Sequence, residues 1–386
     1  MYINGPVNAF HLTGNIDGIS KSLTIFGDYH PTHSQCSDVD AIDISRYIRK
    51  VIKHATKPFD VFFEYPISHM MQLYDKRDKI LATKPMYNMH IVQYNDVFTS
   101  EHVRKQNTDN NTYKALPAKS NDRVRLHYSD IRDRLSFYYF YDNFAAITKY
   151  TDTKTLNLLI DFADYLNSLL KLLKPSHDYT INMDQSYNKT MAHVIDKLLN
   201  RYHHTGIFDI LHIYVKRVID IIEKVIALTN KIIKIIRAIN QSPTDIYTNV
   251  KTHDNIDEDL VTAGQMPQID DMIDYIRDTI VTLRDMNLQI GTLLTDIYFV
   301  QRFLDKDYIC DGIIYTGYAH MLHIIFVLVK YFDFTITNAS YSKYDIDTTN
   351  NNIKQLTKLS YRELNDILMP DTIRQCVNIE NFPRYY

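Results

Sequence analysis

Two histidines in this sequence follow a glycine by three residues, directly after an apolar stretch that is typical of a buried strand. Gly27 and His30 end the segment TIFGDYH, and Gly317 and His320 end the segment IIYTGYAH. A glycine at a strand end allows a tight turn or a close approach of the backbone to a ligand. Because ligands of open α/β sheets bind outside the carboxyl ends of the strands, His30 and His320 would converge there if the two strands are neighbours.

Two carboxylates accompany these histidines. Glu64 ends the apolar stretch FDVFFE, and Asp28 lies inside the first turn. Two imidazoles and a carboxylate suit Zn, Mn, Co or Fe, so we expect a divalent metal ion bound by His30, His320 and Glu64. Asp28 is a further ligand or orients a histidine, and whichever of Glu64 and Asp28 does not bind the metal could accept the proton of a bound water.

Each of these residues also has a purely structural interpretation. Histidines at turns often cap helices or bind backbone groups, a glutamate at a strand end is often solvated, and aspartate caps turns well. Tyr29, Tyr315 and Tyr318 flank the expected crevice, where their hydroxyl groups could donate hydrogen bonds to an oxyanion, although the chain contains 30 tyrosines.

The elements that must position these residues form two similar units. In the first, strand 22–26 precedes a helix over 38–56, for which Ser37 or Asp38 can serve as the N-cap, and strand 59–63 follows. In the second, strand 312–316 precedes helix 319–330 and strand 332–337. A strand, a helix and a strand in succession favour parallel pairing with a right-handed crossover.

These patterns predict an α/β fold, or α+β with high helix content, with a mainly parallel central sheet and a large helical insertion. We divide the chain into an N-terminal half of the core (1–74), an irregular surface excursion (75–127), a helical insertion or subdomain (128–268), a C-terminal half of the core (269–340) and a polar tail with a short helix (341–386). The long helix that begins near residue 207 is typical of an internal bundle helix, although a coiled-coil partner surface is an alternative.

Composition excludes several classes of function. Only 9 of the 386 residues are glycine, and no dinucleotide fingerprint, P-loop or nucleophile elbow is present. The net charge of −3 gives no reason to expect nucleic-acid binding. The three cysteines favour a reducing compartment over a disulfide framework. No signal peptide and no membrane span is visible, so we expect an intracellular, soluble protein.

The two Gly-x-x-His turns and the strand that ends in Glu64 resemble the TIKI/TraB superfamily, with its ChaN and erythromycin-esterase-like relatives. Gly27-Asp28-Tyr29-His30 is similar to the ChaN-like branch, which has an acidic residue after the glycine. Arg284 and Asn287 lie where the TraB-like pattern has an Arg-Asn pair, which makes them candidates for supporting the site. The segment from residue 296 to 328 also resembles uncharacterised proteins of large DNA viruses.

The resemblance implies a metal-dependent hydrolase, peptidase-like as in the Tiki branch or esterase-like, that acts on an unidentified small molecule or peptide. Haem, which the ChaN branch binds, is less expected here than a divalent metal ion. The alternative is a catalytically inactive virion or host-interaction protein that retains the fold and binds a protein partner through its helical insertion, because large insertions commonly carry binding surfaces. For a viral protein, the host cytoplasm or the virion is the expected location.

Overall fold

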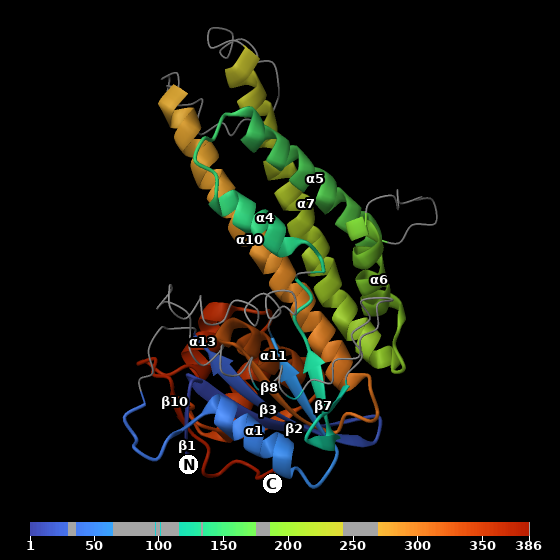
Figure 1. Ribbon diagram of the computed structural model, residues 1–386, viewed down its shortest axis with the longest axis vertical. Coiled ribbons are helices and arrows are strands. Elements are labelled where there is room, and N and C mark those ends of the chain that lie inside the picture. The colour runs from blue at the N-terminus through green and yellow to red at the C-terminus, as the bar shows by residue number, and fades with distance from the viewer. Residues whose placement is uncertain are drawn as a thin grey trace. The chain divides into compact units, whose positions relative to one another are not determined.

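The computed structural model describes residues 1–29, 36–64, 97, 101, 116–132, 134–174, 186–241 and 269–385. The chain divides into two compact units: one comprises residues 1–130, 203–207 and 298–386, and the other comprises residues 131–202 and 208–297. The first unit contains the sheets, and the second is helical (Figure 1).

The expectation of a mixed α/β fold is confirmed by a seven-stranded sheet in the first unit. Its strands, in spatial order, are β6 (Leu116–Ala118), β7 (Asn121–Tyr128), β5 (Phe59–Phe63), β8 (Asp311–Gly317), β3 (Ile19–Asp28), β2 (Asn8–Ile16) and β9 (Thr335–Ala339). The four strands β7, β5, β8 and β3 pair in parallel, whereas β6, β2 and β9 pair antiparallel. The sheet is therefore mixed, with a parallel centre.

Both predicted strand–helix–strand units are present, and they interlock. β5 follows β3 and α1 (Ile44–His54) in the chain, yet β8 lies between β3 and β5 in the sheet. β9 follows β8 and α11 (Tyr318–Tyr331), yet β3 and β2 separate β8 from β9. The insertion of β8 makes the two glycine-bearing strands direct neighbours.

A helix covers each face of the sheet beside these strands. Phe26 of β3 packs in one apolar cluster with Ile48 and Val51 of α1. The next residue, Gly27, points the other way, where a β-carbon would lie 2.5 Å from Met321 Sδ of α11. α11 is almost entirely buried, and it also contacts α12 (Ile346–Gln355) and α13 (Tyr361–Leu368).

The start of α1 differs from the expectation. The helix begins at Ile44, and its N-cap is Asp43, whose side chain accepts a hydrogen bond from the Ser45 main-chain N–H. Ser37 and Asp38 therefore lie well before the helix. The short strand β4 (Ile42–Asp43), which pairs with β1 (Tyr2–Asn4), occupies the residues directly before α1.

A second, three-stranded sheet contains β4, β1 and β10 (Cys376–Asn378), with β1 in the centre. The end of the chain thereby comes close to its beginning, and a disulfide bond joins Cys36 to Cys376. The sequence pattern predicted free thiols, which is wrong for this pair. Cysteines 340 residues apart have no recognisable spacing, and the pairing of β1 with both β4 and β10 brings their segments together.

The second unit contains α4 (Phe137–Ala145), α5 (Thr153–Leu173), α6 (Ser186–Asn200), most of α7 (Thr205–Gln241) and most of α10 (Ile269–Leu304). α4 and α5 share an aromatic cluster made up of Phe137, Phe140, Phe144, Phe162 and Tyr165. One apolar stripe of α7 is buried, from Leu211 through Val218, Ile222, Val225 and Ile232 to Ile236, whereas Ile213 is 53% exposed. In the described part of the chain, no helix is long and apolar enough to cross a membrane.

Candidate functional site

The carboxyl ends of β3, β8 and β5 lie side by side at one edge of the sheet. In the parallel register, Asp28 at the end of β3 is opposite Gly317 at the end of β8, and Phe63 at the end of β5 is opposite Tyr315. Glu64 directly follows β5, and its main-chain N–H donates to the Tyr315 carbonyl oxygen at 3.3 Å. Three strands that are distant in the sequence thus end together at the edge where α/β proteins bind ligands.

Glu64 and His320 form a buried pair at this edge. His320 Nε2 lies 3.1 Å from Glu64 Oε1, and the two side chains are only 6% and 8% exposed. Glu64 Oε2 accepts hydrogen bonds from Thr316 Oγ1 at 2.9 Å and from the Gly317 N–H at 2.8 Å. Because Gly317 is the N-cap of α11, the carboxylate lies at a helix N-terminus, where the helix dipole favours negative charge.

Asp28 is held in a second group of contacts. It is fully buried, and Oδ2 accepts a hydrogen bond from the Tyr315 hydroxyl at 2.6 Å. Oδ1 accepts one from Gln375 Nε2 at 3.3 Å. Tyr315 and Thr316 are consecutive residues of one strand, so they point to opposite faces of the sheet. The hydrogen bond between Tyr315 and Asp28 therefore lies on the face of the sheet that α1 covers. The hydrogen bond between Thr316 and Glu64 lies on the other face, next to α11.

The two turn glycines have different roles. At Gly27, α11 approaches so closely that a β-carbon would overlap Met321. Gly317 has φ −59° and ψ 147°, which other residues also adopt, and it contributes its N–H to Glu64. Beside them, the rings of Tyr29 and Tyr318 lie 5.0 Å apart, with Tyr29 47% exposed.

The other predicted site residues lie elsewhere or outside the described part of the chain. Arg284 pairs with Asp285 and lies over the ring of Tyr141. Asn287 is fully buried and donates to the Phe137 carbonyl oxygen at 3.0 Å. All of these contacts are within the helical unit, so a role for Arg284 and Asn287 at the sheet edge stays a prediction. His30 lies outside the described residues.

The geometry of Glu64 and His320 fits two ligands of one divalent ion. Two donors that each bind a tetrahedral zinc ion at about 2.0–2.1 Å are roughly 3.3 Å apart. The distance of 3.1 Å between His320 Nε2 and Glu64 Oε1 is close to that value. Within the described residues, no group of three His, Cys, Asp or Glu side chains could hold a metal ion. A complete set of ligands there requires a residue such as His30.

The local sequence does not identify Gln375 as a residue of this edge. It follows no motif and is separated from Asp28 by 347 residues, so only tertiary structure brings the two together. Its side chain is fully buried. Tyr315 is one of three tyrosines expected beside the crevice, but no sequence signal indicates that its hydroxyl group reaches Asp28.

A further charged cluster lies away from this edge, near the start of β5. Asp60 is fully buried and accepts two hydrogen bonds from Arg125, at 2.7 and 2.6 Å, and one from His127 at 2.6 Å. Burial alone would raise the pKa of Asp60, but the bonds from Arg125 and His127 outweigh it and lower the pKa. Burial lowers the pKa of His127, which stacks on Phe62. Every strong donor here is already paired, as expected for a structural network.

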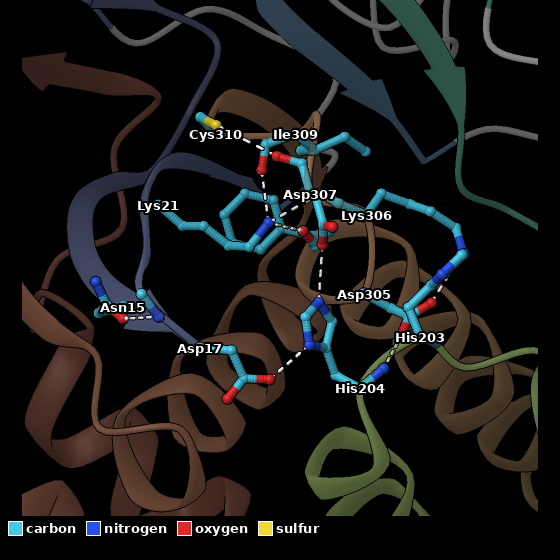
Figure 2. Close-up of polar contacts among 12 residues, drawn as sticks. Asn15, Asp17, Lys21, His203, His204, Asp305, Lys306, Asp307, Ile309 and Cys310 are labelled. Atoms are coloured by element: carbon cyan, nitrogen blue, oxygen red, sulfur yellow. Dashed lines mark hydrogen bonds and ion pairs between the residues drawn. The ribbon is translucent and has the colours of Figure 1, made fainter.

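Another polar cluster surrounds the end of α10 (Figure 2). Lys21 is buried and donates to the carbonyl oxygens of Phe303, Lys306 and Ile309 at 3.1, 3.0 and 2.6 Å. His204 lies between two carboxylates, with Nδ1 2.5 Å from Asp17 and Nε2 2.8 Å from Asp307. Lys21 satisfies carbonyl groups at and just after the C-terminal end of α10, and His204 joins separate loops, so we assign both a structural role.

The chain is thus an α/β protein with a buried glutamate–histidine pair at the carboxyl edge of its parallel strands. It belongs to the family of unknown function DUF5847, whose family model matches residues 1–386. Similar proteins occur in Acanthamoeba polyphaga mimivirus. The uncharacterised protein R706 is 27% identical over 420 residues, covering 100% of this chain and 96% of R706, and R161 is 24% identical with 100% and 98% coverage.

The resemblance to uncharacterised proteins of large DNA viruses is therefore confirmed. The likeness to the TIKI/TraB superfamily stays a prediction, because none of these relatives is described in those terms. No solved structure matches this chain.

Proposed function

We propose that this protein is a metal-dependent hydrolase whose centre lies at the carboxyl edge of the parallel strands. One observation carries the proposal: Glu64 and His320 are both buried, and His320 Nε2 lies 3.1 Å from Glu64 Oε1. The two residues follow β5 and β8, which are neighbours in the sheet. Glu64 and His320 would hold a divalent ion together with His30. When bound, such an ion polarises a carbonyl group and lowers the pKa of a water molecule.

The residues around the pair have supporting roles in this proposal. Thr316 and the Gly317 N–H bind Glu64 Oε2 and so direct Oε1 toward His320. Hydrogen bonds to a metal-binding side chain orient that side chain, and their removal typically weakens the binding of the metal. Asp28 and Tyr315 join the end of β3 to β8, next to Gly317. The similarity to the TIKI/TraB turns supports hydrolysis as the reaction, with a small molecule or a peptide as the substrate.

The test is the metal content of the purified protein. We expect near-stoichiometric Zn, Mn, Co or Fe by elemental analysis, and a loss of at least tenfold in the affinity for that metal in His320→Ala and in His30→Ala. His54→Ala is a matched control, because His54 is exposed at the end of α1. The control should retain the metal content of the wild type.

Equal and negligible metal in all four proteins, after incubation with each of the four metals, would refute the metal site. That result would instead favour the second candidate, a binding protein of the virion or of the virus–host interface that has kept the fold without the chemistry. Circular dichroism of each variant establishes that the loss of metal is not a loss of fold.

A further inference from the structure

A residue near the C-terminus contacts Asp28 at the carboxyl edge of the parallel strands, and the proposed function does not by itself require this contact. Gln375, which directly precedes β10, is fully buried and donates from Nε2 to Asp28 Oδ1 at 3.3 Å. The Tyr315 hydroxyl holds the other oxygen, Oδ2, at 2.6 Å. Tyr315 and Gln375 donate to different oxygens of Asp28, so a rotation of this carboxylate would break both hydrogen bonds.

A covalent bond is formed by the residue next to Gln375. Its neighbour Cys376 forms a disulfide bond with Cys36, across a separation of 340 residues. β10 has only three residues and lies at the edge of its sheet, and the Gln375 carbonyl oxygen accepts one main-chain hydrogen bond, from Gly5 at 3.2 Å. A short edge strand is weakly held by its own backbone bonds. The disulfide adds a covalent link to this strand, which also pairs with β1 and buries Val377 in the core cluster.

The disulfide is also accessible. Cys36 and Cys376 are both partly exposed, whereas the Gln375 side chain between Cys376 and Asp28 is fully buried. A small thiol reagent can consequently reach the sulfur atoms without opening the core. Accessible disulfides are the ones that exchange readily with thiols.

We propose that Gln375 is a positioning residue for Asp28, and that the Cys36–Cys376 disulfide makes this positioning depend on the redox state of the protein. A dithiol reductant donates two electrons and two protons, the bond between the two Sγ atoms breaks, and two thiols form while the dithiol becomes a cyclic disulfide. Without the bond, Cys376 and Gln375 are released from Cys36, and the amide of Gln375 loses its alignment with Asp28.

The consequence for the metal centre rests on the proposed function. Asp28 joins the end of β3 to β8 beside Gly317, whose N–H binds Glu64. Loss of a residue that orients a metal site typically weakens metal affinity by about 10–100-fold. We therefore expect the oxidised protein to bind a divalent ion at least tenfold more tightly than the reduced protein.

The first experiment tests the positioning without any metal. In protein labelled with 15N at glutamine, the side-chain amide resonance of Gln375 is assigned by its absence in Gln375→Met, which keeps the size of the side chain but removes the donor. We expect this resonance to move on Asp28→Asn substitution, on reduction with a dithiol, and in Cys36→Ser without reductant. Cys310→Ser is the matched control, since Cys310 is a free cysteine, and it should behave as the wild type.

Three free thiols in the purified, unreduced protein would overturn the inference, as would a Gln375 resonance that neither reduction nor Asp28→Asn moves. The second experiment measures Zn2+ affinity of the wild type before and after reduction, and of Gln375→Met. Equal affinity in all three would show that Gln375 does not influence the site. If none of them binds Zn2+, Mn2+, Co2+ or Fe2+, the proposed function fails, and the resonance experiment still decides the positioning.

Discussion

At Gly27, the backbone of β3 passes so close to α11 that a side chain has no room. The nearest atoms to an added β-carbon are Met321 Sδ at 2.5 Å and Met321 Cε at 2.9 Å. The scarcity of glycine in the sequence singled out this residue, and the structure gives the reason in close packing. A positive φ is found instead at Gly5 and Gly18.

We predict that Gly27→Ala destabilises the protein by about 1–3 kcal/mol, because the new methyl group overpacks a buried contact. Chemical denaturation measures the loss. In the double variant Gly27→Ala/Met321→Ala, the total loss should be smaller than the sum of the two single losses, since the cavity accommodates the methyl group. Gly206→Ala is the control, because nothing lies within 4 Å of a β-carbon there, and it should be neutral or slightly stabilising.

The buried charge of Asp60 allows a second prediction at this scale. Asp60→Asn leaves Arg125 and His127 without their ionised partner, and removing one member of a buried ion pair is strongly destabilising. We expect a loss of about 3 kcal/mol in the free energy of unfolding. Asp122→Asn, at an exposed position of β7, should change it by less than about 0.5 kcal/mol. Equal effects of the two substitutions would contradict a structural role for the Asp60 network.

Among single residues, those at the candidate site differ in how far the sequence identifies them. Glu64 and His320 follow recognisable strands, so the sequence locates them at the ends of those strands. Their mutual contact depends on β8 lying next to β5, which no local pattern specifies. Gln375 belongs to no motif and follows no recognisable strand pattern. Its partner Asp28 lies near the other end of the chain, so the local sequence does not indicate their contact.

At the scale of elements, the β2–β3 hairpin is the largest feature that the sequence analysis did not include. β2 and β3 pair along their whole length, and the turn between them contains Asp17 and Gly18, both with positive φ. Asp-Gly between apolar stretches is a strong hairpin signal, because the favoured turn requires positive φ at both positions. The hairpin was therefore predictable from residues 16–19, whereas its place between β8 and β9 was not.

His204 joins three segments of the first unit: the residues before α7, the β2–β3 turn and the loop after α10 (Figure 2). The main-chain N–H groups of His203 and His204 also donate to Asp305, at 2.6 and 3.0 Å, and Asp305 pairs with Lys306. The hydrogen bond to Asp307 raises the pKa of His204, and the bond to Asp17 adds to it, although burial opposes both.

This arrangement predicts how the stability of the protein changes with pH. A histidine whose pKa is raised on folding stabilises the folded state fully below its unfolded pKa, which is about 6.5, and the contribution is lost as pH rises through the folded pKa. The stability advantage of the wild type over His204→Gln should thus be largest near pH 6 and decline above it. Urea denaturation of both proteins from pH 6 to pH 9 measures this difference in the free energy of unfolding.

Asp17→Asn and Asp307→Asn provide the matched controls for that prediction. Each removes one carboxylate that faces the imidazole, so each should reduce the pH dependence, and the double variant should abolish most of it. A stability difference that is constant from pH 6 to pH 9 would show that His204 acts only through packing.

For the molecule as a whole, the interlocked order of the central strands decides which residues meet. β3 and β5 come from the N-terminal part of the chain, and β8 from its C-terminal part lies between them. The same closure brings β10 to β1, and the disulfide reinforces it. The first unit is consequently built from both ends of the chain, and each end depends on the other.

We predict that the disulfide contributes substantially to the stability of the protein. Cys36→Ser should lower the free energy of unfolding under non-reducing conditions by about 2–5 kcal/mol, since the bond restricts the unfolded chain over a long loop. Cys310→Ser should have little effect, because Cys310 is free. Reduction of the wild type should reproduce the loss, and an unchanged denaturation midpoint after reduction would contradict it.

The sequence by itself determined the fold class, the strands that carry the two glycines, the main helices and the residue types available for chemistry. These depend on local periodicity and turn chemistry, which are properties of neighbouring residues. Only the tertiary structure decided that β8 lies between β3 and β5, that Glu64 reaches His320, that Gln375 reaches Asp28, and that Cys36 is bonded to Cys376. These contacts join residues hundreds of positions apart, and long-range packing selects them without leaving a pattern in the local sequence.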